Sequence, residues 1–545
     1  MPASQRLLAI VFLCAAAWAC AQSLSSVRGV VLDPSGAAVP HASLTLTNPS
    51  TGANRTTLSD SAGRYAFLQV QPGTYQIAAT APGFNPVTVK HVVLLVDSPS
   101  TVEVAFVRVG GAAQSVSVTA DTTQINTTDA SIGNAIGAHA IMQLPLEARS
   151  VVGLLSLQPG VTWLGDVEPG DENDYRSGAV NGGKNDQGNV TLDGIDVNNQ
   201  QSRDAFTSVL RVTPDSVDEF RVTTTNGGAE SGRTSGAQVA LITKSGTNQF
   251  HGSLYDYLRN TATSANDFLS NAAGVPRAKL NRNLFGGTLG GPVKKDRLFF
   301  FVNYEGRQDR SESSQIRVVP NATFRQGAFN YLTKSGAIAT LSPAQIVQLD
   351  PLHKGADPAI LQLFQSFPLP NDTTVGDNLN TGGYRFNAST PSHLNDYIAR
   401  LDYKIDSAGK HTLFWRGSLQ DDHIFNGAPE FPGDPASSAY LDHSKGFAVG
   451  YTALLRPNLV STFHYGLTRE GIGITGDQTA GAISLSNIDD RHALTDPLTV
   501  IIPTHMFSED VAWSKGAHTV TFGASARIIR NRRDNYQNAY SFAFA

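Results

Sequence analysis

Residues 397–403 read Tyr-Ile-Ala-Arg-Leu-Asp-Tyr, and their alternation decides the fold class of the chain. Tyr, Ala, Leu and Tyr occupy one face, while Arg400 and Asp402 fall on the other. A two-residue period of this kind is typical of a β-strand with one apolar face and one polar face. In a membrane such a strand turns its apolar face to lipid. We therefore expect a mainly β protein whose sheet crosses a membrane.

Nine further segments have the composition of membrane strands, and most contain the roughly nine to eleven residues that a tilted strand needs to cross a bilayer. Short connections alternate with long ones, and short periplasmic turns facing long extracellular loops are the signature of an outer-membrane β-barrel. The ten predicted strands are 250–260, 282–291, 297–307, 396–406, 411–421, 445–455, 458–469, 505–514, 517–530 and 536–545. The long connections are 261–281, 308–395, 422–444 and 470–504.

The composition narrows the class of protein. A chain of 545 residues has room for roughly two to four domains. After the N-terminus, no apolar run reaches the roughly eighteen residues that a membrane helix needs. The net charge of −5 is spread along the chain and forms no basic stripe, so we expect no nucleic-acid partner. Fifty glycines and only three methionines favour turns and strands over helices.

The first 21 residues have the three parts of a secretory signal peptide. Arg6 supplies the positive charge, residues 7–18 are apolar, and Ala-Cys-Ala ending at Ala21 is a cleavage site. Both cysteines of the chain, Cys14 and Cys20, lie in this segment. The mature chain would therefore contain no cysteine, which excludes disulfides, thiol catalysis and cysteine-bound zinc.

Residues 22–109 show short alternating strands separated by turn sequences such as Asp-Pro-Ser-Gly at 33–36. This pattern predicts a small β-sandwich. The motifs Val-Arg-Gly-Val-Val at 27–31, Asp-x-x-Gly-x-Tyr-x-Phe at 60–67 and Pro-Gly-x-Tyr-x-Ile at 72–77 resemble the carboxypeptidase-regulatory-like domain. The resemblance implies a transthyretin-like sandwich without the peptidase. The chain also contains neither His-Glu-x-x-His nor Gly-x-Ser-x-Gly, so we expect no enzyme and no catalytic residues.

Residues 110–131 are small and polar, which is typical of a linker. One part of it resembles the TonB box, the segment through which a TonB-dependent receptor pairs with a periplasmic energy-transducing protein by strand addition. A β-prone linker without this role is the alternative interpretation. The candidate TonB contact consists of Gln114, Ser115, Val116, Ser117, Val118, Thr119 and Ala120.

Residues 132–244 resemble the plug of TonB-dependent receptors, an α+β domain. The matching features are Leu-Pro-Leu at 144–146, a strand ending in the turn Asp193-Gly194, and a closing strand that runs from Gly236 to Lys244. The chain departs from the family at Asn181-Gly182, where the family often has Arg-Gly. Glu-Ser-Gly at 230–232 replaces the family's Tyr-Gly.

The sequences at 244–252, 285–292 and 295–305 resemble the Oar-like group of TonB-dependent outer-membrane receptors. The resemblance assigns residues 245–545 to the N-terminal part of a transmembrane antiparallel β-barrel. Ten strands are fewer than the roughly 22 of a barrel that encloses a plug. We therefore expect a partial, incomplete barrel and a C-terminally truncated chain that cannot close by itself.

Five acidic residues of the plug segment are the only candidate metal ligands, because several carboxylates on one loop are suited to calcium. A solvated loop without metal is the alternative, since the spacing matches no known calcium motif. We expect no cofactor. The candidates are Asp166, Glu168, Asp171, Glu172 and Asp174.

Two sets of residues are assigned to the membrane surface. Arg527, Arg530, Arg532 and Arg533 follow a strand that should end outside, where lipopolysaccharide phosphates are one candidate partner and solvent is the other. The aromatic residues at 299–301 and Tyr304 are predicted to face lipid and to form part of an aromatic girdle.

The predicted function is import of an unidentified extracellular ligand across the outer membrane of a Gram-negative bacterium. A TonB-like protein would supply the energy from the periplasm, where the sandwich would also lie. The alternative is a surface adhesion or assembly protein that uses the barrel as an anchor. A transporter needs a working connection between the linker and the plug, whereas an anchor does not.

Overall fold

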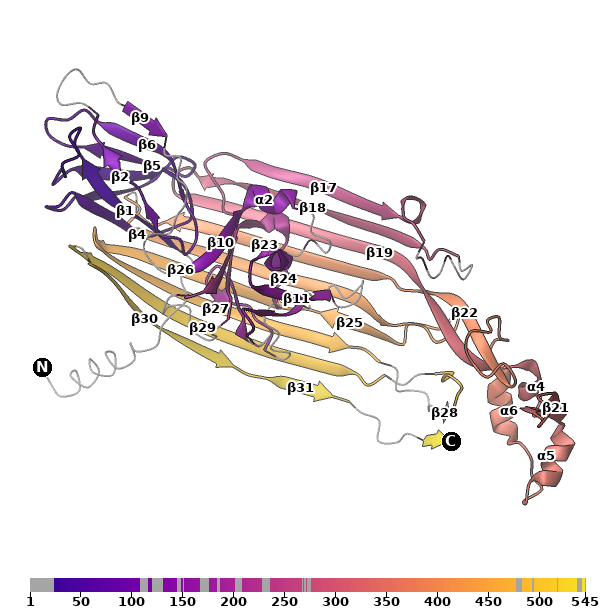
Figure 1. Ribbon diagram of the computed structural model, residues 1–545. Helices are drawn as coiled ribbons and strands as arrows, with labels where there is room; N and C mark the ends of the chain where they lie inside the picture. Colours follow the sequence, from indigo (N-terminus) through magenta and orange to yellow (C-terminus); the bar gives the residue numbers. More distant parts are fainter. Residues whose placement is uncertain are drawn as a thin grey trace, which may run out of the picture.

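Three bodies follow one another along the chain in the computed structural model (Figure 1). We call them the sandwich (24–107 with 116–119), the enclosed domain (131–244) and the barrel sheet (251–535). The sandwich lies at one end of the barrel sheet, and the enclosed domain lies against one face of it. The structure describes residues 24–107, 116–119, 131–144, 149, 151–166, 176–183, 187–200, 208–227, 236–266, 268, 271, 276–406, 408–476, 483–492, 495–516, 518–536 and 542–544. The predicted signal peptide falls outside these residues.

The sandwich consists of two packed sheets with a shared apolar core. One sheet contains β4 (Arg64–Val70), β1 (Ser25–Leu32), β7 (Ser100–Thr101) and β8 (Val104–Ala105). The other has the order β3 (Ala53–Leu58), β2 (Ser43–Asn48), β5 (Gly73–Thr80), β6 (Val87–Leu94) and β9 (Val116–Thr119). Buried and half-buried residues alternate strictly along β1, so each strand turns one face to the core. The core includes Val27, Leu44, Ile77 and Phe106, which confirms the predicted β-sandwich.

The enclosed domain is built around one mixed sheet. Its strand order is β10 (Ile132–Gly137), β15 (Val217–Thr225), β16 (Gln238–Thr243), β13 (Asn189–Leu192) and β14 (Ile195–Asp196). Helix α2 (Ala138–Gln143) and the 3-10 helix η1 (Val151–Leu157) pack on it, and β11 (Val161–Asp166) pairs with β12 (Arg176–Val180) as a separate hairpin. All four residues of β13 are buried, so this strand lies in the centre of the domain.

The barrel sheet is antiparallel throughout, and each strand pairs with its neighbours in chain order. Its main strands are β17 (His251–Asn260), β18 (Leu280–Lys294), β19 (Leu298–Pro320), β23 (Ser392–Lys404), β24 (His411–Gly427), β26 (Lys445–Arg456), β27 (Leu459–Ile474), β29 (Leu498–Lys515) and β30 (His518–Ile529). These strands confirm nine of the ten predicted ones. Within the described residues, no pairing joins β17 to β30, so the sheet is an open, curved wall.

Of the tenth predicted strand, 536–545, the structure describes only residues 536 and 542–544. Phe542–Phe544 form the strand β32, which pairs in parallel with β28 (Ile483–Leu485), so for these three residues the prediction of a barrel strand is wrong. The barrel sheet instead continues from β30 into the short β31 (Arg532–Asn535), which pairs with β29.

The alternation at 397–403 has the predicted orientation. Tyr397, Leu401 and Tyr403 expose 45%, 41% and 38% of their surface on the outer face of β23. Ile398 and Arg400 expose 2% and 7% on the face that meets the enclosed domain. The polar face of the barrel sheet is therefore an interior that the enclosed domain fills.

The prediction for residues 299–304 is wrong in part. Phe299 and Phe301 are buried on the inner face, whereas Phe300 and Tyr304 are only half-buried. Consecutive residues of a strand point to opposite faces, so three phenylalanines in a row cannot all face lipid. Phe299 instead packs under the ammonium group of Lys404, which lies 5.6 Å from its ring.

The predicted long loop 308–395 is also wrong, because much of it is ordered. Strand β19 continues to Pro320 and pairs with β22 (Thr381–Ser389), forming a hairpin that projects beyond the rest of the sheet (Figure 1). The stretch is polar, so its composition predicted a loop. The pairing of β19 with β22 depends on strand register, which composition does not reveal. Its tip carries α4 (Ala322–Arg325), β20 (Phe329–Leu332), β21 (Ile338–Leu341), α5 (Pro343–Leu349) and α6 (Pro358–Gln365). None of the described helices has the length and apolarity needed to span a bilayer.

Candidate functional site: the interface between the enclosed domain and the barrel sheet

The turn Asp193-Gly194 joins β13 to β14 and places a carboxylate at the centre of the interface. Leu192 pairs with Ile195 across it, so the turn contains two residues. Both have positive φ angles, 49° and 80°, as a tight hairpin turn of the Asp-Gly type requires. The Asp193 side chain exposes only 2% of its surface. A carboxylate so deeply buried needs charged or hydrogen-bonding partners.

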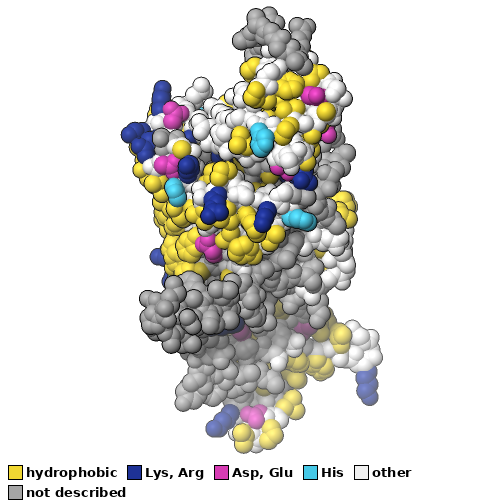
Figure 2. Space-filling view, turned by 90° about the vertical axis from the view of Figure 1, so that its left-hand side faces the viewer, with side chains coloured by type: hydrophobic (Ala, Val, Ile, Leu, Met, Phe, Trp, Pro, Cys, Tyr) yellow, Lys and Arg dark blue, Asp and Glu magenta, His cyan; other side chains and the backbone are white. Residues whose placement is uncertain are grey.

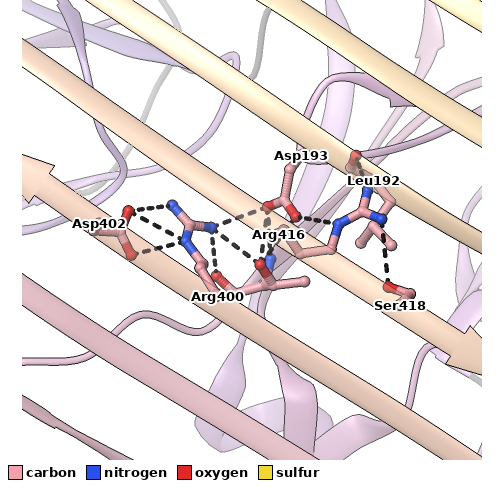
Figure 3. A network of polar contacts seen from close by, with 7 residues as sticks. Leu192, Asp193, Arg400, Asp402, Arg416 and Ser418 are labelled. Carbon is pink, nitrogen blue, oxygen red and sulfur yellow. Dashed lines mark hydrogen bonds and ion pairs between the residues drawn. The ribbon is translucent and has the colours of Figure 1, made fainter.

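Two arginines of the barrel sheet and one threonine provide these partners (Figure 3). The guanidinium Nη1 of Arg400 on β23 donates to Oδ1 of Asp193 at 3.0 Å. Nε of Arg416 on β24 donates to Oδ2 at 3.2 Å. Thr243, the last residue of β16, donates its backbone N–H to the same carboxylate at 3.0 Å and its hydroxyl at 2.9 Å.

The remaining donors of the two arginines are also occupied. Nη2 of Arg416 donates to the carbonyl of Leu192 at 3.0 Å, and Nη1 donates to the Ser418 hydroxyl. Arg400 makes an ion pair with Asp402 at 3.0 Å on its own strand. Two cations and two carboxylates thus balance, with Asp193, Arg400 and Arg416 buried and Asp402 half-buried. We call this network of Asp193, Thr243, Arg400, Asp402 and Arg416 the Asp193 lock.

A second ion-pair group lies near β17. Arg149 of the enclosed domain pairs with Asp215 of its own domain and, at 3.1 Å, with Glu305 on β19. The Tyr255 hydroxyl donates to the same Glu305 carboxylate at 2.8 Å. Burial by itself would lower the pKa of Arg149, but the two carboxylates outweigh it and raise that pKa above its ordinary value. The charge on Arg149 is therefore permanent at any physiological pH.

Two further ion pairs join the enclosed domain to β24 and β30. Arg211 pairs with Asp422, and Arg527 pairs with Asp196 at 2.5 Å. The second pair corrects the placement of Arg527 at the outer surface, facing lipopolysaccharide or solvent, because its side chain turns inward. Its position on β30 has the parity of the inner face, which the sequence alone did not reveal. Arg532 forms an exposed pair with Asp534 at 2.8 Å instead.

Apolar contacts between the ion pairs depend on glycines of the barrel sheet. A Cβ atom at Gly466 of β27 would come within 2.6 Å of the Ile195 side chain. A Cβ atom at Gly446 of β26 would come within 2.8 Å of Leu210. Real Cβ contacts are never so short, so these glycines leave the space in which Ile195 and Leu210 sit.

Asp193 and Gly194 are the predicted motif residues that the structure brings into the interface, whereas Gly236 and Lys244 stabilise the enclosed domain itself. The N–H of Gly236 donates to the Gln187 carbonyl at 2.9 Å, and a Cβ there would lie 2.2 Å from that oxygen. The N–H of Lys244 donates to the Ser216 carbonyl at 2.8 Å. Burial lowers the pKa of Lys244, against the opposing effect of Asp215 and Asp218.

Sequence reasoning missed most of the partners from the barrel sheet. Arg400 was visible on the polar face of an alternating strand, but Arg416 carried no motif, and Glu305 lay in the motif at 295–305 without a predicted contact. A usable signal exists: a charged residue at an inward position of a membrane strand must find a partner inside. That rule would have marked these residues, although not the residues that they contact.

The predicted metal ligands remain untested. Asp166 ends β11 and pairs with Arg176 of β12 in the sheet register, while Glu168, Asp171, Glu172 and Asp174 lie outside the described residues. In the described part of the chain, no three His, Cys, Asp or Glu side chains are grouped so that they could hold a metal ion.

The candidate TonB contact is extended where the structure describes it. Residues 116–119 form β9, which pairs in parallel with β6 from Val87↔Val116 to Lys90↔Thr119. Gln114, Ser115 and Ala120 lie outside the described residues. The predicted β-conformation is confirmed for Val116–Thr119, and the contact with a TonB-like protein stays a prediction.

Comparison with known protein families decides the classification of the chain. The family described as Outer membrane beta barrel domain matches residues 242–545, more than half of the chain. The chain belongs to this family. Residues 26–107 of this outer-membrane protein match the Carboxypeptidase regulatory-like domain. These matches place it in the outer membrane of a Gram-negative bacterium.

A curated relative that matches this outer-membrane protein is the TonB-dependent transporter Oar of Myxococcus xanthus. The two are 26% identical over 295 residues, which cover 51% of this chain and 26% of Oar. The chain thus spans about a quarter of the length of that relative. Similar solved structures include the outer-membrane transporter YddB of Escherichia coli (12% identity, TM-score 0.49, 74% of this chain and 48% of YddB). Another is the siderophore receptor PirA of Acinetobacter baumannii (14% identity, TM-score 0.42, 74% of this chain and 48% of PirA).

Proposed function

We propose that this protein imports a ligand across the outer membrane and draws energy from a TonB-like protein in the periplasm. The enclosed domain is then the plug of the pathway, and segment 114–120 is the point at which force is applied. The Asp193 lock carries this proposal, because buried ion pairs hold a separate domain inside a polar, membrane-crossing sheet. The Oar relative is a transporter by name, which supports the same conclusion.

The arrangement suits a channel that is closed at rest and opened by force. An uncompensated charge inside the barrel sheet is costly, so the enclosed domain does not leave spontaneously. Strand β9 precedes the enclosed domain in the chain and presents backbone groups for pairing. A periplasmic partner that adds a strand there is bound to the chain by main-chain hydrogen bonds and can pull on it.

Replacing Val116 by proline tests this function. Proline removes a backbone N–H and cannot extend a strand pairing, so the TonB-like protein should no longer bind this segment. The measurement is disulfide crosslinking in the living cell between Ser117→Cys and a cysteine placed in the C-terminal domain of the bacterium's own TonB-like protein. We expect a crosslink with Ser117→Cys and its loss, at least tenfold, when Val116→Pro is added.

Val107→Pro is the matched control, since Val107 is half exposed and lies outside the candidate segment. It should leave the crosslink intact. Equal crosslinking with and without Val116→Pro would reject this segment as the point of contact. Absence of any crosslink along 114–120 would reject TonB-driven import as a whole.

A surface anchor is the second candidate function, and the projecting hairpin favours it. The tip beyond β19 and β22 contributes Phe364 and Phe367 to an apolar cluster that also contains Phe431, and it exposes several large apolar residues. An ordered tip with exposed apolar groups is suited to binding another surface. The exposed residues are Leu332, Ile338, Leu349 and Leu352. An anchor would keep its binding activity with Val116→Pro, whereas a transporter would lose uptake.

A further inference from the structure

The sandwich is docked on the end of the barrel sheet through its strand β4. Along β4, Tyr65 and Phe67 are buried while Arg64 is exposed and Ala66 is half-buried, but Leu68 and Gln69 are both buried. Consecutive residues of a strand point to opposite faces, so one of these two side chains should point away from the sandwich core and into solvent. Because both are buried, another part of the molecule must cover that side chain. Leu68 packs with Val460 and Ala512 of the barrel sheet and not with the sandwich core.

Gln69 adds a polar contact beside this apolar one. Its side-chain Oε1 accepts a hydrogen bond of 2.9 Å from the hydroxyl of Thr462 on β27. The backbone of Gln69 has a φ of +47°, which is unusual for a residue with a side chain. The surrounding contacts hold this conformation, so the docking surface has a defined shape.

The other sheet of the sandwich contacts the same end of the barrel sheet at different strands. The backbone N–H of Asn248, just before β17, donates to the Ser50 carbonyl at 2.9 Å. The ammonium group of Lys404 at the end of β23 donates to the Thr51 carbonyl at 2.7 Å. The sandwich therefore bridges both halves of the barrel sheet, from β17 and β23 to β27 and β29.

A third contact reaches the enclosed domain. The N–H of Val96 donates to Oε1 of Glu219 at 2.7 Å, and the Val96 side chain packs with Ala240 and Ile242 of β16. The sandwich thus lies across the end of the barrel sheet and also contacts the enclosed domain (Figure 1). Charged side chains of both signs are mixed with hydrophobic ones on the face seen in Figure 2.

Strand β9 lies on the edge of the sandwich that is remote from these contacts (Figure 1). It is the last strand in the order β3-β2-β5-β6-β9, so it pairs with β6 on one side and with no other described strand on the second side. An edge of this kind accepts a further strand. A strand added to β9 would become the sixth strand of the sandwich sheet.

We propose that the sandwich is a lid over the periplasmic end of the barrel sheet, and that force applied at β9 undocks it before the enclosed domain moves. This inference rests on the proposed function, because it takes segment 114–120 as the point of pulling. Force on β9 enters the sandwich through its pairing with β6 and through the chain. The docking contacts are spread over three small patches, which separate one after another.

Accessibility of Ala512 tests whether the lid is removable. Ala512→Cys places a thiol under Leu68, in a full-length chain whose Cys14 and Cys20 are replaced by serine. The probe is a bulky, membrane-impermeant maleimide applied to protein in outer-membrane vesicles open to the periplasmic side. We expect slow labelling, and labelling at least tenfold faster when Leu68→Ser is added.

Leu58→Ser is the matched control, because Leu58 exposes 60% of its surface on β3 and should change nothing. Gln69→Gly is a second docking variant that keeps the sandwich folded, since glycine favours the positive φ and lacks the bond to Thr462. It should also accelerate labelling. Unchanged labelling in both docking variants would show that the sandwich is not a lid held by these contacts.

Pulling on β9 tests whether the sandwich undocks before the enclosed domain moves. A cantilever pulls the full chain in a supported bilayer through a ligation tag inserted after Ala120. The pair Ser50→Cys and Asn248→Cys locks the sandwich to the barrel sheet, because their backbones are hydrogen-bonded neighbours. The pair Thr45→Cys and Thr56→Cys, whose hydroxyls are 3.4 Å apart within the sandwich, is the matched control.

We expect a first force peak that disappears when the Ser50–Asn248 pair is oxidised and returns when it is reduced. Oxidation of the Thr45–Thr56 pair should leave that peak in place. If the first force peak is the same with the Ser50–Asn248 disulfide oxidised or reduced, the proposal that the sandwich acts as a lid is wrong. The test is independent of the crosslinking to the TonB-like protein, so failure of the lid and failure of the proposed function give different results.

Discussion

The enclosed domain and the sandwich contact the same barrel sheet by different chemistry. The enclosed domain is held by buried ion pairs, among them Asp193 with Arg400 and Arg416, and Arg211 with Asp422. The sandwich docks through neutral hydrogen bonds, one lysine-to-carbonyl contact and a small apolar patch at Leu68.

The difference sets the order in which the two bodies are released. Breaking a buried ion pair leaves an uncompensated charge and costs about 3–5 kcal/mol. Breaking a neutral hydrogen bond costs on the order of 1 kcal/mol. The sandwich is therefore the body that separates first under load. Release of the enclosed domain requires an interaction that neutralises its buried charges or replaces its ion pairs.

The largest expected effect comes from Asp193→Asn. The substitution keeps the shape of the side chain but leaves Arg400 and Arg416 with one ion-pair partner, Asp402, between them. We expect a loss of about 3–5 kcal/mol in the free energy that holds the enclosed domain in place. Protease cleavage within 131–244 at increasing urea concentration measures it. Asp421→Asn is the control, because Asp421 is largely exposed and pairs only with an exposed histidine among the contacts seen.

Removing one arginine sharpens this result. Arg416→Met in the Asp193→Asn background restores the charge balance, because Arg400 keeps its pair with Asp402. We expect the double variant to regain at least about half of the lost stability, since a hydrophobic replacement of a buried pair is often neutral. A double variant no better than Asp193→Asn would mean that charge balance is not what stabilises the interface.

Gly466→Val should have the next largest effect. The new side chain would occupy the space of Ile195, and overpacking of this kind costs about 1–3 kcal/mol. Gly473→Val on the same strand is the control, because a Cβ there makes only an ordinary contact of 3.7 Å with Leu441. The same protease assay should separate the two variants, and equal behaviour would remove Gly466 from the interface.

The smallest effect concerns pH and the sandwich. Burial raises the pKa of Glu219 to about 8 in the docked state, although the hydrogen bond from Val96 N–H lowers it. Undocking exposes Glu219 to water and returns its pKa toward the ordinary range of a glutamate, so the docked state holds a proton that the undocked state releases. Docking therefore weakens as the pH rises from that ordinary range to about 8. We expect labelling of Ala512→Cys, normalised to the unfolded chain, to rise several-fold over this window. Glu219→Gln should flatten the profile, and an unchanged profile would exclude Glu219 as the cause.

Local patterns predicted those features that depend on neighbouring residues alone. The alternation at 397–403 predicted the strand and its inward Arg400, and Asp193-Gly194 predicted a tight turn. The arginine partners of Asp193 lie more than 200 residues away, so no local pattern joins them. The burial of Leu68 was equally unpredictable from local sequence, because the residues that cover it belong to the barrel sheet. The hairpin beyond Arg307 was missed because register, and not composition, specifies its pairing.

Hydrogen exchange at two backbone amides compares the two interfaces most directly. Thr243 N–H donates to the Asp193 carboxylate inside the Asp193 lock, and Val96 N–H donates to the Glu219 carboxylate between the sandwich and the enclosed domain. Both residues are buried and both amides donate to a side-chain carboxyl oxygen, and measurement above about pH 8, where Glu219 is also ionised, makes the comparison matched. If the sandwich undocks first, Val96 should exchange at least about tenfold faster than Thr243 in the full chain. Equal protection of the two amides would contradict the account, because the sandwich would then be held as firmly as the enclosed domain.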